Sequence, residues 1–287
     1  MILIADSGST KTHWYWKDEN RTEHLVSTSG INPFLLTEEE MERILRQELL
    51  SQVPEDTRFE QIFFYGAGCT PEKSVVVKAC LQRCFPPSTQ LEVTSDLVGA
   101  ARSLCQHEAG IACILGTGSN SCAYNGKEIT QNVSPLGYML GDEGSGAVLG
   151  RTLLGDCLKK QLPEAIVQDF FDTYALTPAQ ILEKVYRTPM PNRFMASLTP
   201  FLTKHRKAPE IHRLLTEQFA RFFQRNVMQY AYTELPIHLT GSIAWYFQSE
   251  VTEAAQALGL PLSSFLQSPI DGLKRYHEEG EDVSKLK

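Results

Sequence analysis

The chain has 287 residues, enough for two domains of ordinary size. Hydrophobic residues make up 42% and charged residues 21%, a globular composition that excludes a disordered chain, collagen and a coiled coil. The formal net charge of −7 leaves no cationic surface for nucleic acid phosphates, so the composition favours a small-molecule function.

The cysteines and the amino terminus indicate a cytoplasmic protein. Seven cysteines are an odd number, and they are scattered without CxxC pairs in a chain too long to need disulfides. The apolar residues 1–5 meet Asp6 at once, which leaves too short a run for a signal peptide or a membrane span. We therefore expect a soluble protein of the reducing cytoplasm, without membrane contact.

Two short strands open the chain around a turn of small polar residues. Residues 2–5 are apolar and residues 13–16 are aromatic, and both patterns are typical of strands. The intervening residues 6–12 predict a hairpin turn. A capping box of Thr37 and Glu40 then predicts a helix over 38–51.

Strands and helices alternate up to residue 106. The pattern predicts a strand at 61–65, a glycine turn at 66–68 and a helix at 71–85. A second strand at 91–94 and a second helix at 97–106 follow. The second strand brings Asp96 to the start of the last helix. Because the carboxyl end of a strand is where open α/β sheets place ligands, Asp96 is a candidate catalyst; a helix cap is an equally compatible role.

The opening pattern recurs after Gly110. Residues 111–115 predict a buried strand, 116–120 a turn of small residues, and 121–124 a second strand that ends at a tight turn. Two copies of one strand–turn–strand unit, about 110 residues apart, indicate an internal duplication. We expect the boundary between the halves near residue 106.

The remainder is expected to be helical and then mixed. Residues 145–235 have helical character, with an apolar stripe that suits a core. The later predictions are a strand at 236–240 ending in Gly241-Ser242, a strand at 265–266, a helix at 270–279 and a frayed charged tail at 278–287.

The two small-residue turns are candidate phosphate sites. Phosphate binding requires backbone N–H groups and hydroxyls brought close without bulky side chains, which both turns supply. Either turn alone fits an ordinary polar β-turn equally well. Two such turns at matching places in two hairpins favour phosphate binding, because together they could hold a polyphosphate.

Two further segments are candidates for ligand contact. Asn32, before Pro33, could hydrogen-bond a sugar hydroxyl, although a simple turn explains it equally well. Residues 137–146 place Asp142 and Glu143 among four glycines at the start of a helix. The acids could be helix caps, but the glycines favour close approach by a ligand.

Taken in chain order, four motifs resemble the N-acetylglucosamine kinase family, which belongs to the BadF/BadG/BcrA/BcrD ATPases of the sugar kinase–Hsp70–actin superfamily. The motifs are Asp-Ser-Gly-Ser-Thr-Lys-Thr at 6–12, Gly-Thr-Gly-Ser-Asn at 116–120, Gly-Asp-Glu-Gly-Ser at 141–145 and Leu-Thr-Gly-Ser at 239–242. They run from residue 6 to about residue 245, so the resemblance covers most of the chain.

The resemblance implies an α/β fold of two ribonuclease-H-like, actin-like ATPase lobes with a nucleotide and sugar cleft between them. The N-terminal lobe would be 1–106, with a C-terminal helix of about 270–287 packing back on it, and the C-terminal lobe would be 107–269. The implied enzyme is a kinase that uses ATP and Mg²⁺ to phosphorylate the 6-hydroxyl of an amino sugar, first of all N-acetylglucosamine. Family members are often dimers, so a homodimer is expected.

The resemblance also assigns site residues by motif match. The nucleotide would contact Gly8, Ser9, Thr10, Lys11 and Thr12 of a first phosphate loop, Gly116, Thr117, Gly118 and Ser119 of a second, and Gly241 and Ser242 of an adenosine loop. Asp6 would hold Mg²⁺ through water, and Asp96 would be the catalytic base that accepts the hydroxyl proton. The sugar would contact Asn32, Asn120 and Asp142.

Two departures from the family pattern support an alternative. Ser7 and Ser9 stand where the family often has glycine, and Ser242 replaces the second glycine of the adenosine loop. A serine forced to a positive φ would be strained, so either these positions are sterically ordinary or the loops are altered. The serines motivate the alternative of a non-catalytic sugar or nucleotide sensor. A third reading, an ATPase that activates a dehydratase through an iron–sulfur cluster, lacks a close cysteine pair beyond Cys80 and Cys84.

Overall fold

The structure, a computed structural model, describes residues 1–284 and divides into two compact units. The first unit comprises Met1–Glu108, Gly126–Glu128 and Ser268–Lys287, and the second comprises Ala109–Asn125 and Ile129–Gln267. The chain first passes from one unit to the other after Glu108, close to the boundary expected near residue 106. Each unit is described by itself below.

The first unit contains a mixed five-stranded sheet with the order β3-β2-β1-β4-β5. The strands are β1 (Ile2–Ser7), β2 (Lys11–Lys17), β3 (Glu23–Ser29), β4 (Gln61–Gly66) and β5 (Gln90–Ser95). The first three strands form an antiparallel meander, whereas β1, β4 and β5 run parallel. The parallel strands therefore end at one edge of the sheet, and β1 and β5 deliver Asp6 and Asp96 to that edge.

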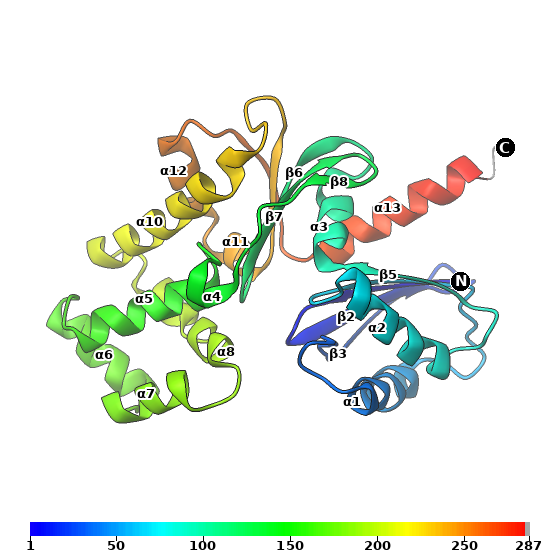
Figure 1. The fold of residues 1–287 in the computed structure, drawn as a ribbon, viewed down its shortest axis with the longest axis horizontal. Helices are drawn as coiled ribbons and strands as arrows, with labels where there is room; N and C mark the ends of the chain where they lie inside the picture. The colour runs from blue at the N-terminus through cyan, green and yellow to red at the C-terminus, as the bar shows by residue number, and fades with distance from the viewer. Residues whose placement is uncertain (285–287) are drawn as a thin grey trace. The chain divides into compact units, whose positions relative to one another are not determined.

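Helices cover both faces of this sheet. They are α1 (Glu38–Arg43), continued by a π-helical stretch Ile44–Leu49 and a 3₁₀ turn Leu50–Gln52, then α2 (Pro71–Cys84), α3 (Asp96–Cys105) and α13 (Pro269–Ser284). The capping box of Thr37 and Glu40 is present at the start of α1. On the other face, α3 and α13 pack against each other, and Ile270 and Leu273 of α13 join the core around Ile4 (Figure 1).

The C-terminal helix is longer than the 270–279 that its own pattern predicted, and closer to the helix of about 270–287 that the resemblance implied. It continues to Ser284 instead of ending at residue 279, so the expectation of a frayed tail from residue 278 is wrong over the helical part. The segment contains no proline, and its acidic residues are compatible with a helix. Glu278 is also held by Lys17, 2.6 Å away on β2. Residues 285–287, the end of the predicted tail, lie outside the described residues.

The second unit repeats the topology of the first. Its strands are β6 (Ala109–Leu115), β7 (Ser119–Asn125), β8 (Ile129–Gln131), β9 (Ile237–Thr240) and β10 (Leu262–Leu266). Their order is β10-β9-β6-β7-β8, with an antiparallel meander from β6 to β8 and parallel β6, β9 and β10. The predicted duplication and the fold class of two ribonuclease-H-like, actin-like units are confirmed by these matching sheets.

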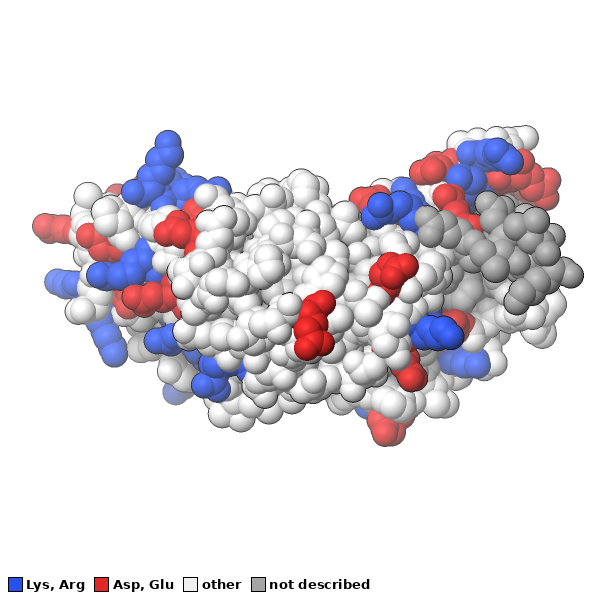
Figure 2. Space-filling view, turned by 90° about the horizontal axis from the view of Figure 1, so that it is seen from above, with Lys and Arg blue, Asp and Glu red and all other residues white. Residues whose placement is uncertain are grey.

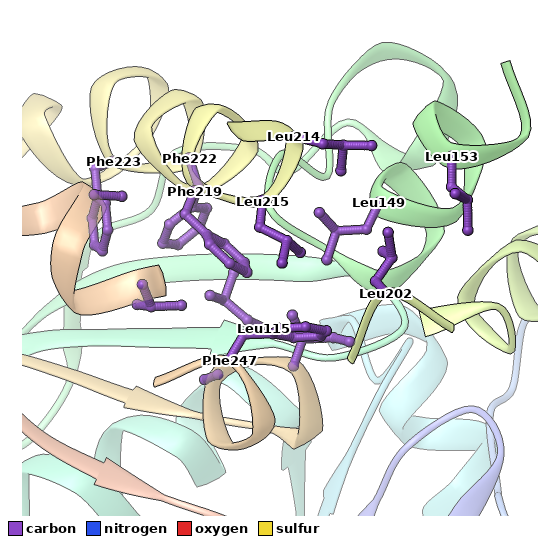
Figure 3. Packing of buried hydrophobic residues seen from close by; sticks show 14 of the residues in the cluster. Leu115, Leu149, Leu153, Leu202, Leu214, Leu215, Phe219, Phe222, Phe223 and Phe247 are labelled. Atoms are coloured by element: carbon purple, nitrogen blue, oxygen red, sulfur yellow. The ribbon is translucent and has the colours of Figure 1, made fainter. Parts of the chain in front are cut away.

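A large helical insertion separates β8 from β9, as the sequence predicted. It contains α4 (Gly137–Leu140), α5 (Gly146–Leu158), α6 (Glu164–Tyr174), α7 (Pro178–Tyr186), α8 (Pro191–Ala196), α9 (Thr199–His205) and α10 (Pro209–Arg225); α11 (Ser242–Tyr246) and α12 (Gln248–Ala257) follow β9. The predicted apolar stripe on α10 is buried: Phe219, Phe222 and Phe223 pack in one core with Leu115 of β6 (Figure 3).

The surface and the helices agree with a globular composition. On the face drawn in Figure 2, basic and acidic side chains are interspersed. Within residues 1–284, no helix has the length and apolar character needed to cross a bilayer. The seven cysteines form no disulfide within the described residues, and six of them are buried.

Candidate active site

The first small-residue turn is an open loop at the ends of β1 and β2. The N–H of Gly8 donates to the carbonyl of Lys11 at 2.9 Å, which closes the loop. Gly8, Thr10 and Lys11 are exposed and Ser9 is half-buried, so this backbone is accessible to a ligand. Neither Ser7 nor Ser9 has a positive φ. The two serines therefore occupy ordinary backbone, and the strain considered in the sequence analysis does not arise.

The end of β3 fixes the shape of this loop. The N–H of Gly30 donates to the carbonyl of Thr10 at 3.0 Å, and a Cβ at Gly30 would lie only 2.7 Å from the backbone nitrogen of Lys11. Only glycine permits such close approach of two backbones. Gly30 was not among the predicted site residues, because nothing in its local sequence reveals a contact with a loop twenty residues away.

Two hydroxyls hold the same junction from inside. The Ser7 and Thr12 hydroxyls lie 2.7 Å apart, and the N–H of Ile31 donates to the Ser7 oxygen at 3.0 Å. Thr12 also donates to the carbonyl of Ser29 at 3.2 Å, and its side chain is fully buried. The buried Thr12 side chain therefore stabilises the loop from the protein interior, whereas residues 8–11 form the part of the loop that faces solvent.

Asp6 and Asp96 lie at neighbouring positions on the carboxyl edge of the first sheet. Asp6 is opposite Tyr65 of β4, and the next residue of β4, Gly66, is opposite Ser95, whose hydroxyl caps α3. Burial, followed by the charge of Asp96, raises the pKa of Asp6 to about 7. Burial also raises the pKa of Asp96 to about 6, against the opposing effect of the backbone N–H groups at the start of α3.

This carboxylate pair fits a magnesium ion that arrives with a nucleotide. Mg²⁺ in such sites keeps several waters and is bound through one or two carboxylates together with substrate phosphates. Among residues 1–284 there is no group of three or more His, Cys, Asp or Glu side chains that could hold a metal ion. A cation beside Asp6 would offset the burial and the Asp96 charge that together raise its pKa. The donor set therefore suits Mg²⁺ bound with phosphates better than a permanently bound metal.

Asn32 connects the loop to a glycine turn after β4. Its Nδ2 donates to the Ser9 hydroxyl at 2.7 Å, and its Oδ1 accepts the N–H of Phe34 at 2.9 Å. Gly68, at φ 76°, packs so closely on Asn32 that a Cβ there would clash with the Asn32 carboxamide. The Asn32 side chain is thus fixed in direction next to the phosphate loop, and Gly68 is a second glycine that the sequence analysis missed as part of the site.

The second small-residue turn is tied to the start of α5. Within the turn, the N–H of Gly116 donates to the carbonyl of Gly118 at 2.9 Å. The first N–H groups of α5, on Gly146 and Ala147, donate to the carbonyls of Gly116 and Thr117 at 2.8 and 3.1 Å. The donors that are usually free at a helix N-terminus therefore anchor the turn.

The predicted adenosine loop lies beside this turn. Thr240 of β9 is opposite Ile114 of β6, so the residues that follow the two strands are neighbours. Gly241 has a φ of 104°, and a Cβ there would lie 2.8 Å from the carbonyl carbon of Leu115, which requires glycine. Ser242, in contrast, begins α11 without a positive φ and is exposed. The serine at this position is therefore sterically ordinary.

Asp142 lies against the same turn. Its Oδ1 accepts the N–H of Ser119 at 3.3 Å, and a Cβ on Gly118 would be 3.1 Å from its other oxygen. Burial raises the pKa of Asp142 to about 6; the Ser119 N–H opposes this shift and Glu143 adds to it. Glu143 is itself bound by Arg225. Asp142 has a φ of 53°, a conformation that aspartate tolerates better than most residues.

Asn120 lies on β7, directly after the turn. Its Oδ1 accepts hydrogen bonds from the Ser121 N–H at 2.9 Å and from Asn132 Nδ2 at 3.0 Å. Asn132 also donates to the carbonyl of Ser121 at 2.6 Å. The oxygen of Asn120 is therefore turned toward its own strand, which leaves its amide group as the part that can donate to a ligand.

The predicted residues thus gather into two half-sites, one in each unit. The N-terminal half-site contains Asp6, residues 8–12, Asn32 and Asp96. The C-terminal half-site contains residues 116–120, Asp142 and residues 241–242. Chemically, the first offers carboxylates and an open hairpin loop, and the second offers a glycine turn beside a further carboxylate.

Comparison with known proteins shows where this arrangement occurs. No protein-family model matches the sequence, and no curated protein matches it. Among solved structures, a Porphyromonas gingivalis protein provisionally named an N-acetylglucosamine kinase is 46% identical, with a TM-score of 0.95 over 98% of this chain and 100% of the other. A Chromobacterium violaceum protein with the same provisional name is 16% identical, with a TM-score of 0.75 over 94% and 96% of the two chains.

A more distant match shows the fold alone. The ROK-family glucokinase of Streptomyces griseus, solved in complex with glucose and AMPPNP, is 13% identical, with a TM-score of 0.54 over 93% of this chain and 95% of the other.

The match to the Porphyromonas gingivalis protein confirms the resemblance inferred from the motifs over nearly the whole length of the chain. With 46% identity to the Porphyromonas gingivalis protein over 98% of its residues, the chain belongs to the N-acetylglucosamine kinase-like family of the sugar kinase–Hsp70–actin superfamily.

Proposed function

We propose that this protein is an ATP-dependent sugar kinase that phosphorylates the 6-hydroxyl of an amino sugar, with N-acetylglucosamine as the first candidate. The observation that carries the proposal is the pair Asp6 and Asp96, two electrostatically coupled carboxyls at one sheet edge. Phosphoryl transfer requires a group to accept the hydroxyl proton and a means of neutralising phosphate charge, and this pair can serve both needs.

In the proposed reaction, Asp96 accepts the proton of the sugar 6-hydroxyl. Its pKa of about 6 leaves it ionised above neutral pH while keeping it basic enough to take a proton. Asp6 holds Mg²⁺ through water, and the ion when bound neutralises charge on the transferring phosphoryl group. In the proposal, residues 8–11 and residues 116–119 are phosphate-binding loops, and Gly241 and Ser242 form an adenosine-binding loop.

The side chains proposed to contact the sugar are those of Asn32, Asn120 and Asp142. Asn32 is already fixed by Ser9 and by the Phe34 N–H, so little conformational entropy is lost when it binds a hydroxyl. Asp142, ionised above about pH 6, would accept a hydrogen bond from a sugar hydroxyl, and the Asn120 amide would donate one. The proposed setting is the cytoplasm, with a homodimer as the assembly that the resemblance implies.

The two alternatives have less support than the kinase. The serines that favoured a sensor occupy ordinary backbone at positions 7, 9 and 242, so they give no steric reason for lost turnover. An activator of a dehydratase would need accessible cysteines for a bridging cluster, whereas six of the seven are buried.

A sugar panel tests the proposal directly. The purified protein is incubated with Mg²⁺-ATP and N-acetylglucosamine, N-acetylmuramic acid, glucosamine or glucose, and ADP release is measured together with the product by mass spectrometry. We expect sugar-dependent ADP release and a monophosphate ester at C6, fastest with an acetamido sugar. Tight sugar binding by calorimetry without any phosphorylated product would instead establish the sensor.

A further inference from the structure

A polar pocket of about 210 Å³ lies between α5 and α10 in the second unit, apart from the C-terminal half-site. Thr152 and Asp156 of α5 line it, whereas the half-site contacts the first residues of that helix, Gly146 and Ala147. At 1.5 Å per residue, Thr152 is about 9 Å farther along the axis than Gly146. The pocket is therefore a separate feature, and the proposed kinase reaction makes no use of it.

The charges around this pocket favour a cation. Asp156 comes from α5, and Glu210 and Glu217 come from one face of α10, against a single cation, Arg213. Burial raises the pKa of Asp156, Arg213 and then Lys159 oppose that shift, and Glu217 adds to it, so a second cation, Lys159, also lies near this carboxylate. Within residues 1–284 none of these three carboxylates has an ion-pair partner within 4 Å.

A buried amide supplies an independent indication of a ligand. Gln218 lines the pocket and only 6% of its surface is exposed. No hydrogen bond of its carboxamide is formed with any other described residue, although buried side-chain amides in folded proteins are as a rule hydrogen-bonded. Its polar atoms are not among the fully enclosed atoms without a partner, so they reach the solvent of the pocket, and a ligand that enters can replace water as their hydrogen-bond partner.

The remaining lining limits the chemistry of that ligand. Leu162 and Leu214 are buried and border the pocket, and Leu214 projects from α10 as Figure 3 shows. These side chains suit methylene groups, which an inorganic ion lacks. The carboxylates in the described part of the chain also form no cluster of three that could hold a metal ion.

We propose that the pocket between α5 and α10 binds a small aliphatic ammonium compound of the diamine class. Its ammonium groups pair with Asp156 and with Glu217, the carbonyl oxygen of Gln218 accepts an N–H, and its methylenes lie against Leu162 and Leu214. Charge-assisted hydrogen bonds to two carboxylates and burial of a short alkyl chain supply the affinity.

Isothermal titration of the full-length protein with putrescine tests this proposal, and 1,4-butanediol serves as the uncharged compound of equal length. We expect saturable binding of putrescine, weak or absent binding of butanediol, and a rise in the thermal midpoint on addition of the diamine. Asp156→Asn and Gln218→Met should each weaken putrescine binding about tenfold. Glu183→Gln, an exposed acid on α7 away from the pocket, should bind as the unmodified protein does.

Three results would overturn the proposal. They are the absence of saturable diamine binding, binding that neither Asp156→Asn nor Gln218→Met weakens, and equal affinity for Mg²⁺, which would indicate general attraction of cations to acids. Because the readout is binding and not phosphoryl transfer, its failure is distinguishable from failure of the proposed kinase.

Discussion

At the residue scale, Asp6 and Asp96 lower the free energy of unfolding at the pH where both must be ionised for the proposed reaction. A carboxyl whose pKa is higher in the folded than in the unfolded protein stabilises the fold while it is protonated, and that contribution is lost as the pH rises through the folded value. For Asp6 this loss occurs up to about pH 7 and for Asp96 up to about pH 6. The ionised pair is therefore maintained at the expense of stability.

Replacing Asp6 by asparagine should make the protein more stable in alkaline buffer. The amide removes a buried negative charge and its repulsion with Asp96, so we expect Asp6→Asn to raise the free energy of unfolding at pH 8 by about 2 kcal/mol. The gain should shrink at pH 5, where Asp6 is already neutral. Urea unfolding at the two pH values measures it, and Asp56→Asn at an exposed position is the control. An equal gain at both pH values would contradict this explanation.

Replacing Asp96 by asparagine should remove catalysis and leave sugar binding nearly unchanged. The amide keeps the shape of the side chain but cannot accept the hydroxyl proton, so we expect kcat to fall about 10³-fold. The affinity for the sugar, measured by calorimetry, should change less than about threefold, because the shape and hydrogen-bonding capacity are kept.

The pH dependence of the unmodified enzyme provides a second check on Asp96. We expect kcat/KM to fall below about pH 6, as its carboxylate becomes protonated. Retained turnover in Asp96→Asn would show that another residue is the base.

At the element scale, the first phosphate loop takes its shape from the strand next to it. The loop between β1 and β2 is fixed by the end of β3, through Gly30 and through the hydroxyls of Ser7 and Thr12. This explains how serines can stand in the loop: the close approach to its backbone is made by Gly30, directly after β3. The loop is thus preorganised for a ligand by tertiary contacts.

Gly30→Ala should therefore weaken nucleotide binding. A Cβ 2.7 Å from the Lys11 nitrogen must displace the loop, so we expect the KM for ATP to rise about tenfold and the free energy of unfolding to fall by about 1–3 kcal/mol. Gly155→Ala is the matched control, because a Cβ on that α5 residue meets nothing within 4 Å. The control should gain about 0.5–1 kcal/mol of stability from higher helix propensity and keep its KM. Similar kinetics for both variants would refute the role given to Gly30.

The sequence predicted those elements whose spacing of apolar residues matches the face that is buried in the structure. The hairpins, the helix that begins at Asp96 and the buried face of α10 were predicted because apolar periodicity and caps are local signals. The strands β3 and β8 were missed. Burial alternates along β3, but apolar and polar residues do not, because the apolar Leu25 is on the outward face and is 57% exposed. The strand β8 is only three residues long. Gly30 and Gly68 were missed because their function lies in tertiary contacts.

At the scale of the whole molecule, one topology occurs twice with different chemistry at corresponding edges. The first sheet carries Asp6 and Asp96 at its carboxyl edge, whereas the second carries the glycine turns that follow β6 and β9. The motifs made this duplication visible in the sequence, since both hairpins contain small-residue turns. The resemblance assigned different roles to the two lobes, but the close contacts at each edge, such as that of Asp142 with Gly118 and Ser119, depend on tertiary structure that the sequence does not show.

If both half-sites act on one nucleotide, a single ligand should protect both units. We expect Mg²⁺ with a non-hydrolysable ATP analogue to slow amide hydrogen exchange in residues 8–12 and in residues 116–119 and 241–242, measured by mass spectrometry. Residues 164–174 of α6, which contribute to neither half-site, should be unaffected. Protection confined to one unit would mean that the other does not bind nucleotide in solution.

The bonds between α5 and the second turn have a consequence for the direction of the turn's own amides. A trans peptide places its carbonyl and N–H on opposite sides. Because the carbonyls of Gly116 and Thr117 accept bonds from α5, the N–H vectors of Thr117 and Gly118 are directed away from that helix, and neither finds an acceptor in the described part of the chain. These two adjacent N–H groups point the same way as the dipole of α5 and so extend its partial positive charge beyond the helix by one peptide unit. A partial positive charge with free N–H donors is what the binding of a terminal phosphate oxygen requires.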